Sequence, residues 1–177
     1  MRPDLGFTTL VAEPLITAFT DRFGATARPQ LDGWRAEARA RKLDELNELH
    51  LLGAANSYFN RLRFADDLLH WREIDYWGTP AESVASGATD CEDFAIAKYF
   101  FLKELGVPIA KLRLTYVKAV KLNQAHMVLV YYPRPEADPL VLDNLDSVVR
   151  PASQRPDLVP RAGPEILHSE ISGFSAR

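Results

Sequence analysis

The chain has 177 residues, a formal net charge of −3 and 47% apolar residues, which suits one domain with a sizeable core and excludes a disordered chain. The slight negative charge and the lack of a stretch rich in Lys and Arg exclude a general attraction for phosphate backbones, so nucleic acid is not an expected partner. The single cysteine excludes an internal disulfide and a zinc site built on several thiolates, and no apolar run has the form of a signal peptide or the length of a membrane span.

Helices are predicted for the first third of the chain. Within residues 35–62, apolar or partly apolar side chains recur at helical spacing, namely Leu43, Leu46, Leu49 and His50. This period predicts an amphipathic helix that ends near Gly53 or continues past it. Residues 64–87 mix aromatic residues with turn formers without a sustained period, so they predict an ordered loop with one short helix after Pro80.

A further helix is predicted over residues 91–105. Asp90 is a favourable N-cap residue, the apolar side chains after it keep a period of about 3.6 residues, and Gly106 and Pro108 end the pattern. The first residue of this helix is Cys91, the only cysteine of the chain.

Strand patterns follow over residues 112–120, 126–132 and 140–145, and the short links between them favour antiparallel pairing. Past Asn144 the chain is rich in Pro and polar residues, so we expect irregular structure there, with an irregular tail from about residue 163. The expected fold is a single α+β domain over residues 1–177, in which N-terminal helices pack on a short antiparallel sheet.

Cys91 is a candidate nucleophile because unpaired backbone N–H groups and the helix dipole stabilise a thiolate at the start of a helix. A lone cysteine is more often a small buried hydrophobic residue, so its neighbours have to decide between the two roles. These neighbours, Asp90, Glu92 and Asp93, place negative charge beside the sulfur and should raise its pKa. A thiolate at this position therefore needs a positive partner.

Two positive partners are compatible with this acidic cluster. One is the imidazolium of a histidine, and the other is a hard cation such as calcium, which takes oxygen ligands from the same carboxylates. The acids also have a purely structural explanation, because acidic residues commonly cap and charge-match the first turn of a helix. The cluster alone leaves these alternatives open.

His126 is the best-placed base among the four histidines. The other three lie where a surface or packing role explains them, namely His50, His70 and His168. His126 opens a predicted strand 35 residues after Cys91, and Asp143, near the end of the next strand, is placed to orient its ring. Cys, His and Asp in this order are compatible with a thiol hydrolase, although the order alone does not establish one.

Longer stretches of the sequence resemble one known family. They are residues 75–80 (DYWGTP), 90–100 (DCEDFAIAKYF), 105–108 (LGVP), 112–119 (LRLTYVKA), 124–129 (QAHMVL) and 139–145 (PLVLDNL). In this order they are similar to the bacterial transglutaminase-like cysteine peptidases, specifically to the periplasmic members that release biofilm adhesins. The similarity extends from about Trp34 to Pro160.

The resemblance implies a papain-like or transglutaminase-like fold and a calcium site that is needed for activity. The catalytic residues that it implies are Cys91, His126 and Asp143. The calcium ligands that it implies are Asp90 and Glu92, with Asp75 or backbone carbonyls of its loop as further ligands. Two departures from the family pattern are visible: Thr89 stands where the family usually has Gly, and the tail from Gly163 does not match.

By the same resemblance, the protein is a calcium-dependent endopeptidase that cuts the N-terminal region of a large cell-surface adhesin next to a pair of alanines and so promotes biofilm dispersal. The implied inhibitor is the periplasmic domain of an inner-membrane receptor for cyclic di-GMP, and the implied location is the periplasm. We expect a monomer. Two alternatives keep the same fold: a calcium-dependent binding module that does not cut, and an amidase that acts on cell-wall peptides.

Overall fold

The computed structural model describes residues 12–43 and 47–161. Its helical half contains α2 (Glu13–Phe23), α3 (Ala27–Leu43), α4 (Glu48–Phe59), β1 (Arg63–Phe64), α5 (Asp67–His70), α6 (Pro80–Ser86), β2 (Ala88–Thr89) and α7 (Cys91–Glu104). Its second half contains η1 (Ile109–Lys111), β3 (Leu112–Ala119), β4 (Gln124–Tyr131), β5 (Leu140–Asp143), β6 (Asp146–Pro151), η2 (Ala152–Gln154) and β7 (Leu158–Pro160). Among these described residues, no helix is both long and apolar enough to cross a bilayer.

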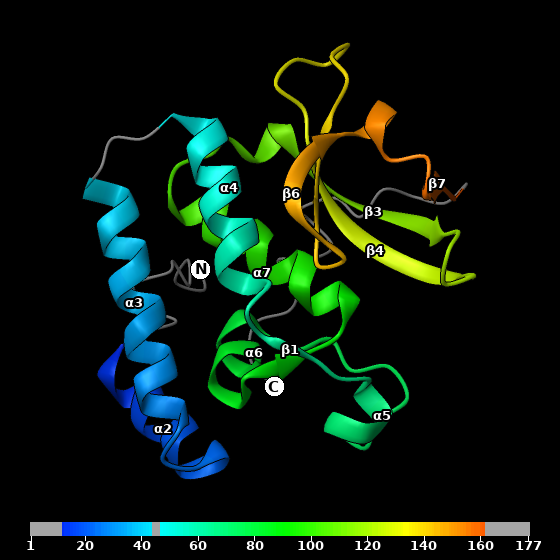
Figure 1. The fold of residues 1–177 in the computed structure, drawn as a ribbon. Coiled ribbons are helices and arrows are strands. Elements are labelled where there is room, and N and C mark those ends of the chain that lie inside the picture. Colours follow the sequence, from blue (N-terminus) through cyan, green and yellow to red (C-terminus); the bar gives the residue numbers. More distant parts are fainter. Residues whose placement is uncertain (1–11, 44–46, 162–177) are drawn as a thin grey trace, which may run out of the picture.

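The second half folds into a five-stranded antiparallel sheet with the strand order β6-β5-β4-β3-β7. Strands β3 and β4 pair along their whole length, from Leu112 opposite Tyr131 to Ala119 opposite Gln124. Figure 1 shows α7 between this curved sheet and the N-terminal helices, and α7 contacts β4 on one side and α4 and α6 on the other. The α+β prediction, with helices packed on a short antiparallel sheet, is confirmed.

Helix α7 is the central element of the fold, and its sequence explains where it begins and ends. Asp90 caps it by accepting a hydrogen bond from the backbone N–H of Asp93 (3.4 Å). Buried apolar residues follow on more than one face, because the helix is enclosed by the sheet and by other helices. The helix ends before Gly106, whose φ of +90° lies in the region that glycine adopts without strain. The predicted helix over residues 91–105 is therefore confirmed.

The long amphipathic helix predicted over residues 35–62 is wrong, because the structure divides this segment between two helices. Helix α3 ends at Leu43, and α4 begins at Glu48 after an N-cap at Asn47. The Asn47 side chain accepts a hydrogen bond from the backbone N–H of His50 (3.1 Å), which starts a new helix within the apolar pattern.

The predicted loop over residues 64–87 has more structure than expected. The expected short helix after Pro80 is present as α6, which has a Thr79 to Glu82 capping box. The loop also contains α5 and the two-residue strand β1, which pairs in parallel with β2. This pairing places the segment that carries Asp67 beside the start of α7.

The irregular structure predicted after Asn144 is also wrong for the part that the structure describes. Strand β6 follows directly and pairs with β5, and β7 pairs with β3 at the opposite edge of the sheet. Pro151 ends β6 and Pro160 ends β7, and prolines are tolerated at such edge positions because edge N–H groups are not all needed in the ladder. The tail predicted from about residue 163 lies outside the described residues.

Candidate active site

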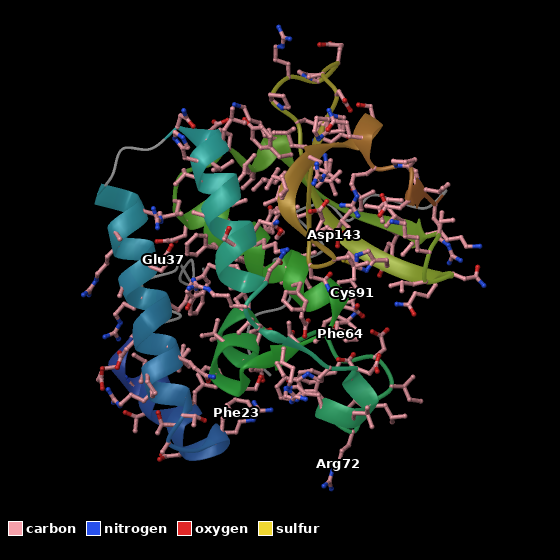
Figure 2. The ribbon with its side chains drawn as sticks, viewed as in Figure 1. Phe23, Glu37, Phe64, Arg72, Cys91 and Asp143 are labelled. Carbon is pink, nitrogen blue, oxygen red and sulfur yellow. The ribbon has the colours of Figure 1, made fainter. Side chains whose placement is uncertain are left out.

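Cys91 lies at the first residue of α7, at the end of the helix that faces the strands. Figure 2 labels Cys91 on α7 and Asp143 on the sheet. Its Sγ donates a hydrogen bond to Glu92 Oε2 (2.9 Å). Burial and the Glu92 carboxylate raise the pKa of the Cys91 thiol, whereas the backbone N–H of Met127 lowers it. Since Met127 follows His126 in β4, this effect places the sulfur near the part of the strand that carries His126.

His126 and Asp143 form a buried hydrogen-bonded pair. They lie on the neighbouring strands β4 and β5, and His126 Nε2 is 2.7 Å from Asp143 Oδ1. The side chains are 2% and 0% exposed, so water does not compete for this bond. With Nε2 on the carboxylate, Nδ1 is the nitrogen that can exchange a proton with a thiol.

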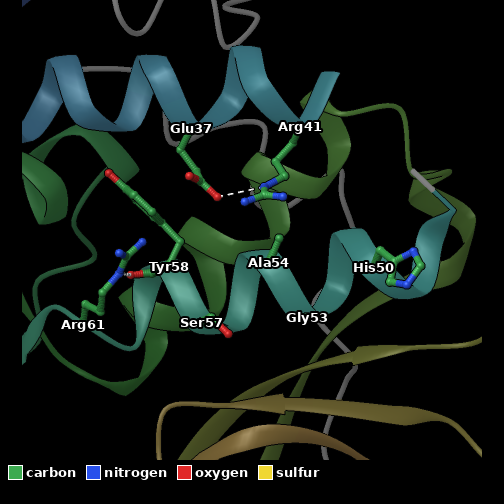
Figure 3. Close-up of a pocket in the computed structure, with 8 residues that line it drawn as sticks. All are labelled: Glu37, Arg41, His50, Gly53, Ala54, Ser57, Tyr58 and Arg61. Atoms are coloured by element: carbon green, nitrogen blue, oxygen red, sulfur yellow. Dashed lines mark hydrogen bonds and ion pairs between the residues drawn. The ribbon is translucent and has the colours of Figure 1, made fainter. Parts of the chain in front are cut away.

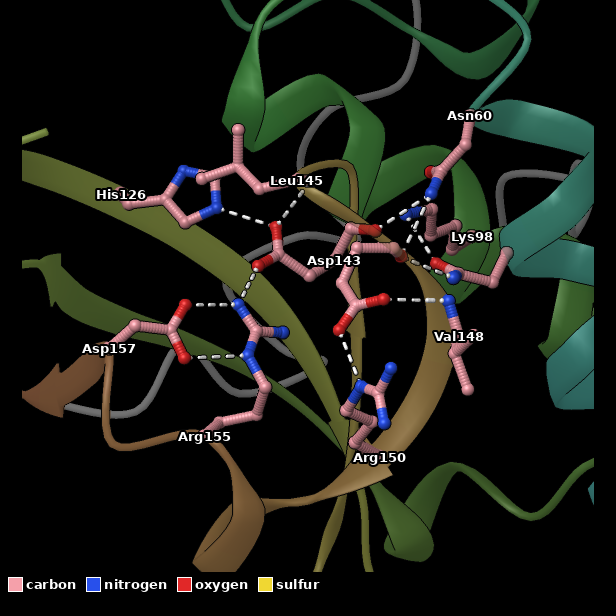
Figure 4. Close-up of polar contacts among 11 residues, drawn as sticks. Asn60, Lys98, His126, Asp143, Leu145, Val148, Arg150, Arg155 and Asp157 are labelled. Atoms are coloured by element: carbon pink, nitrogen blue, oxygen red, sulfur yellow. Dashed lines mark hydrogen bonds and ion pairs between the residues drawn. The ribbon is translucent and has the colours of Figure 1, made fainter. Parts of the chain in front are cut away.

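The Asp143 carboxylate receives three hydrogen bonds. Besides His126, the backbone N–H of Leu145 donates to Oδ1 (3.0 Å) and Arg155 Nη2 donates to Oδ2 (2.7 Å). Burial alone would raise the pKa of Asp143, but the bonds from His126, Leu145 and Arg155 lower it to about 2. Asp143 is therefore ionised throughout the physiological pH range. Figure 4 shows these contacts.

Helix α4 holds the backbone of the same turn. Asn60 Nδ2 donates to the carbonyl oxygen of Asp143 (2.8 Å), and Asn56 Nδ2 donates to that of Asp146 (2.9 Å). Asn56 Oδ1 in turn accepts from Lys98 Nζ (2.8 Å), a buried group of α7 whose pKa burial lowers to about 7. The turn that carries Asp143 is thus hydrogen-bonded to the helical half of the molecule.

A group of three carboxylates lies beside Cys91. One oxygen each of Asp67, Asp90 and Glu92 lies within 4.8 Å of the others. Burial raises the pKa of Asp67, and burial together with the charge of Glu92 raises that of Asp90 to about 9. Like charges this close repel one another, so the group is suited to a cation.

The oxygens of this carboxylate group fit a hard cation such as calcium. Asp67 is 5% exposed, and its Oδ1 has no hydrogen-bond partner among the described residues, while its Oδ2 accepts from the backbone N–H of Tyr76. A buried carboxylate oxygen without a partner is costly, and a cation would satisfy it. All donors of the group are carboxylate oxygens, which calcium prefers to the nitrogen and sulfur ligands that zinc favours.

The predicted ligands Asp90 and Glu92 belong to this group, and sequence reasoning missed Asp67. The predicted third ligand, Asp75, is exposed and accepts a hydrogen bond from Trp77 Nε1 (3.0 Å) instead. Its charge still contributes to the raised pKa of Asp67, so it lies near the group without being one of the three carboxylates. The adjacent pair Asp66-Asp67 was the signal in the sequence, but it also suits a turn.

The remaining acid of the cluster, Asp93, has a structural role. It accepts hydrogen bonds from the backbone N–H of Gly78 (2.7 Å) and from Thr89 Oγ1 (3.0 Å). A Cβ at Gly78 would lie 2.7 Å from Asp93 Oδ2, so this approach needs glycine. Thr89 is buried in β2 without a positive φ angle, and its hydroxyl also bonds Ser83 (3.0 Å), so it fits its position.

A separate groove lies between α3 and α4, and in Figure 3 the strands lie beyond α4. It has a volume of about 570 Å³. The residues that line it are Glu37, Arg41, His50, Gly53, Ala54, Ser57, Tyr58 and Arg61. Glu37 and Arg41 form an ion pair across one helical turn (2.9 Å). The groove contains neither Cys91 nor a member of the carboxylate group.

The geometry combines a thiol at a helix start, an imidazole oriented by an ionised carboxylate, and an acidic group beside the thiol. Such a combination supports nucleophilic attack by sulfur on a carbonyl carbon, with proton transfer by the imidazole. Of the three residues predicted to form a triad, the structure joins His126 of β4 and Asp143 of β5 directly, and it places Cys91 at the start of α7, which contacts β4.

Comparison with known proteins identifies relatives of this chain. The family model of the bacterial transglutaminase-like cysteine proteinases (BTLCP) matches residues 26–157. Calcium-bound LapG from Legionella pneumophila is 39% identical, with a TM-score of 0.73, and the match covers 87% of this chain and 86% of that one.

Two further structures of Legionella pneumophila LapG are similar to the chain. One is 38% identical with a TM-score of 0.74, covering 89% of this chain and 88% of that one. The other, treated with EGTA, is 39% identical with a TM-score of 0.73, covering 86% and 83%. No curated protein sequence matches significantly. The structural similarity confirms the expected transglutaminase-like fold.

Proposed function

Because this chain belongs to the bacterial transglutaminase-like cysteine proteinases, we propose that it is a calcium-dependent endopeptidase with Cys91, His126 and Asp143 as its catalytic triad. The observation that carries the assignment is the buried His126–Asp143 bond of 2.7 Å, next to Met127, whose backbone N–H lowers the pKa of the Cys91 thiol. A buried imidazole that is fixed in one tautomer beside a thiol is the arrangement that a cysteine nucleophile needs.

In the proposed mechanism, His126 Nδ1 takes the proton of the Cys91 thiol, and Sγ attacks the scissile carbonyl carbon. The backbone N–H groups at the start of α7 stabilise the oxyanion, with a second donor from residues 75–77. The imidazolium protonates the leaving amine, which leaves a thioester on Cys91. His126 then deprotonates a water molecule that hydrolyses this thioester, while Asp143 keeps the imidazole oriented throughout.

We also propose that Asp67, Asp90 and Glu92 hold the calcium ion. Two solved relatives are a calcium-bound and an EGTA-treated LapG, and the unpartnered Oδ1 of Asp67 supports the same ion here. Bound there, calcium would neutralise the carboxylate charge that raises the pKa of the Cys91 thiol. Asp75 stays a further possible ligand by family resemblance, outside the carboxylate group.

The proposed substrate is the N-terminal region of a large calcium-binding cell-surface adhesin, cut next to a pair of alanines, and its release would disperse the biofilm. The proposed inhibitor is the periplasmic domain of an inner-membrane receptor for cyclic di-GMP, and the proposed location is the periplasm. These proposals rest on the family resemblance of the sequence, and they make the protein a monomeric protease whose action is controlled by sequestration.

The test is cleavage of an adhesin N-terminal fragment from the same genome, with and without EGTA, followed by addition of Ca²⁺ or Mg²⁺. We expect cleavage that EGTA abolishes and Ca²⁺ restores, and none with Cys91→Ala. Muropeptides are incubated in parallel to detect amidase activity. Full cleavage by Cys91→Ala would rule out the proposed nucleophile, and fragment binding without cleavage by the wild-type protein would favour a binding module.

A further inference from the structure

Arg155 connects the C-terminal part of the fold to the proposed triad. It follows η2 and precedes β7, in the segment that sequence patterns suggested to be irregular. Its side chain is 5% exposed, although arginine is rarely buried without charged partners. Figure 4 shows its guanidinium between Asp143 and Asp157.

The Arg155 guanidinium is oriented by the Asp157 carboxylate and donates a hydrogen bond to the Asp143 carboxylate. Arg155 Nε donates to Asp157 Oδ1 (3.0 Å), and Nη2 donates to Asp157 Oδ2 (2.9 Å), which is a two-point contact that fixes the plane of the guanidinium. Nη2 also donates to Asp143 Oδ2 (2.7 Å). Nη1 is buried without a partner among the described residues, so Arg155 is placed by these two carboxylates and not by a complete set of hydrogen bonds.

This contact determines which oxygen of Asp143 faces the histidine. Oδ1 accepts from His126 Nε2 and from the backbone N–H of Leu145, and Oδ2 accepts from Arg155. With both oxygens occupied, the carboxylate cannot rotate without breaking a charge-assisted bond. Without the Arg155 guanidinium, the buried Asp143 carboxylate would also be protonated more easily. A protonated carboxyl group is a weaker acceptor for the His126 N–H than the carboxylate.

We propose that Arg155 is a positioning residue of the active site, which holds Asp143 ionised and oriented so that His126 keeps its catalytic tautomer. Arg155 touches neither the thiol nor the substrate and acts only through Asp143. This inference rests on the proposed triad of Cys91, His126 and Asp143.

A purely structural role, in which Arg155 only ties down the segment before β7, can be separated from this one. Asp157 provides the matched control, because its side chain bonds Arg155 but not Asp143. Its backbone carbonyl accepts from Val120 and is kept when the side chain is truncated. Asp157→Ala therefore removes the two-point contact that fixes the guanidinium plane, but it keeps the charge of Arg155 beside Asp143.

The experiment measures alkylation of Cys91 by chloroacetamide in the calcium-loaded full chain at one neutral pH. Five proteins are compared: wild type, His126→Ala, Arg155→Met, Arg155→Lys and Asp157→Ala. Thermal unfolding shows that each variant is folded. Proton NMR follows the low-field signal of the His126 Nε2–H, which reports the His126–Asp143 bond directly and would not change if Arg155 only secured the segment.

We expect alkylation to slow by about tenfold or more in Arg155→Met, as for other residues that orient a primary catalytic or metal-binding side chain. Its low-field signal should shift or disappear. Arg155→Lys keeps a charge but not the fixed plane of the guanidinium, so its rate should lie between those of wild type and Arg155→Met, at least about threefold below wild type. Asp157→Ala should lose clearly less than Arg155→Met, because the cation beside Asp143 remains although its plane is no longer fixed.

A folded Arg155→Met with the wild-type rate and signal would overturn the inference, as would an equal loss in Asp157→Ala. If Arg155→Met does not fold, Arg155→Lys decides, and an unchanged rate and signal would overturn the inference. If His126→Ala alkylates as fast as wild type, the triad itself fails. If only the Arg155 variants match wild type, the triad stands and the role of Arg155 fails.

Discussion

Replacing Asp143 by asparagine should damage the site in either orientation of the new amide, because Arg155 and His126 both donate to this side chain. If the amide oxygen faces His126, the NH₂ group meets Arg155 Nη2, donor against donor. If the oxygen faces Arg155, the NH₂ group meets the backbone N–H of Leu145 and forces His126 Nε2 to accept. The proton then moves to Nδ1, which can no longer take the proton of Cys91.

The magnitude follows from these bonds. A hydrogen bond to a charged group contributes about 1.5–3 kcal/mol and a neutral one about 0.5–1.5 kcal/mol, so the amide oxygen prefers Arg155. A preference of about 1.4 kcal/mol leaves roughly one molecule in ten with the oxygen toward His126. Asp143→Asn should therefore lose at least about tenfold in rate, up to the ~10⁴-fold loss known for a wrong histidine tautomer in a Ser-His-Asp triad.

The assay is Cys91 alkylation by chloroacetamide in the presence of calcium, with adhesin-fragment cleavage as the second readout. The informative control is the double variant Asp143→Asn/Arg155→Met, in which the amide oxygen is free to face His126. We expect this variant to regain about tenfold over Asp143→Asn alone, because the two changes are coupled through one bond. A rate for Asp143→Asn within about threefold of wild type, or a double variant slower than Asp143→Asn, would refute the reasoning.

Three further predictions concern calcium and the start of α7. Asp67→Asn should weaken calcium binding in isothermal titration calorimetry by about tenfold or more, whereas Asp75→Asn should change it less than about threefold, and equal losses would restore Asp75 as a ligand. Gly78→Ala should lower the free energy of unfolding by about 1–3 kcal/mol because its Cβ would meet a carboxylate, whereas Gly53→Ala, with open space around its Cβ, should raise it by about 0.5–1 kcal/mol in urea titrations. In calcium-free protein, burial and neighbouring charges raise the pKa of Asp90 from 3.8 to about 9. Protonated Asp90 therefore contributes fully to the free energy of unfolding below the pKa of the unfolded state, and this contribution is lost as the pH rises through the pKa of the folded state. Calcium replaces that proton, so the increase in Tm on adding calcium should be larger near pH 8 than near pH 5, and equal increases would contradict this linkage.

Sequence patterns predicted those parts of the fold that local signals determine. Helix α7 has its own cap at Asp90 and its own end at Gly106, and β3, β4 and β5 each coincide with a strand pattern in the sequence. Strands β6 and β7 were missed because their prolines lie at strand ends, where they indicate irregular structure in a sequence but do not prevent pairing at a sheet edge.

The proposed site also contains residues that local sequence signals indicate and residues that they do not. The proposed triad residues Cys91, His126 and Asp143 lie in α7, β4 and β5, which are three elements that local patterns predict. Asp67 and Arg155 reach the site through tertiary pairing, of β1 with β2 and of β7 with β3, and no local period announces such contacts. Sequence reasoning therefore named the proposed triad and missed Asp67 and Arg155, whose contacts with the site are tertiary.

The position of Arg155 late in the chain also has a consequence for the timing of synthesis. The thiol, the imidazole, the carboxylate and the guanidinium are added in that order as the polypeptide grows. The proposed nucleophile is present long before its proposed base, and that base is present before the arginine proposed to position the carboxylate. With the proposed roles, a nascent or truncated chain that ends before Arg155 would contain the thiol, the imidazole and the carboxylate but would react more slowly than the chain that includes Arg155.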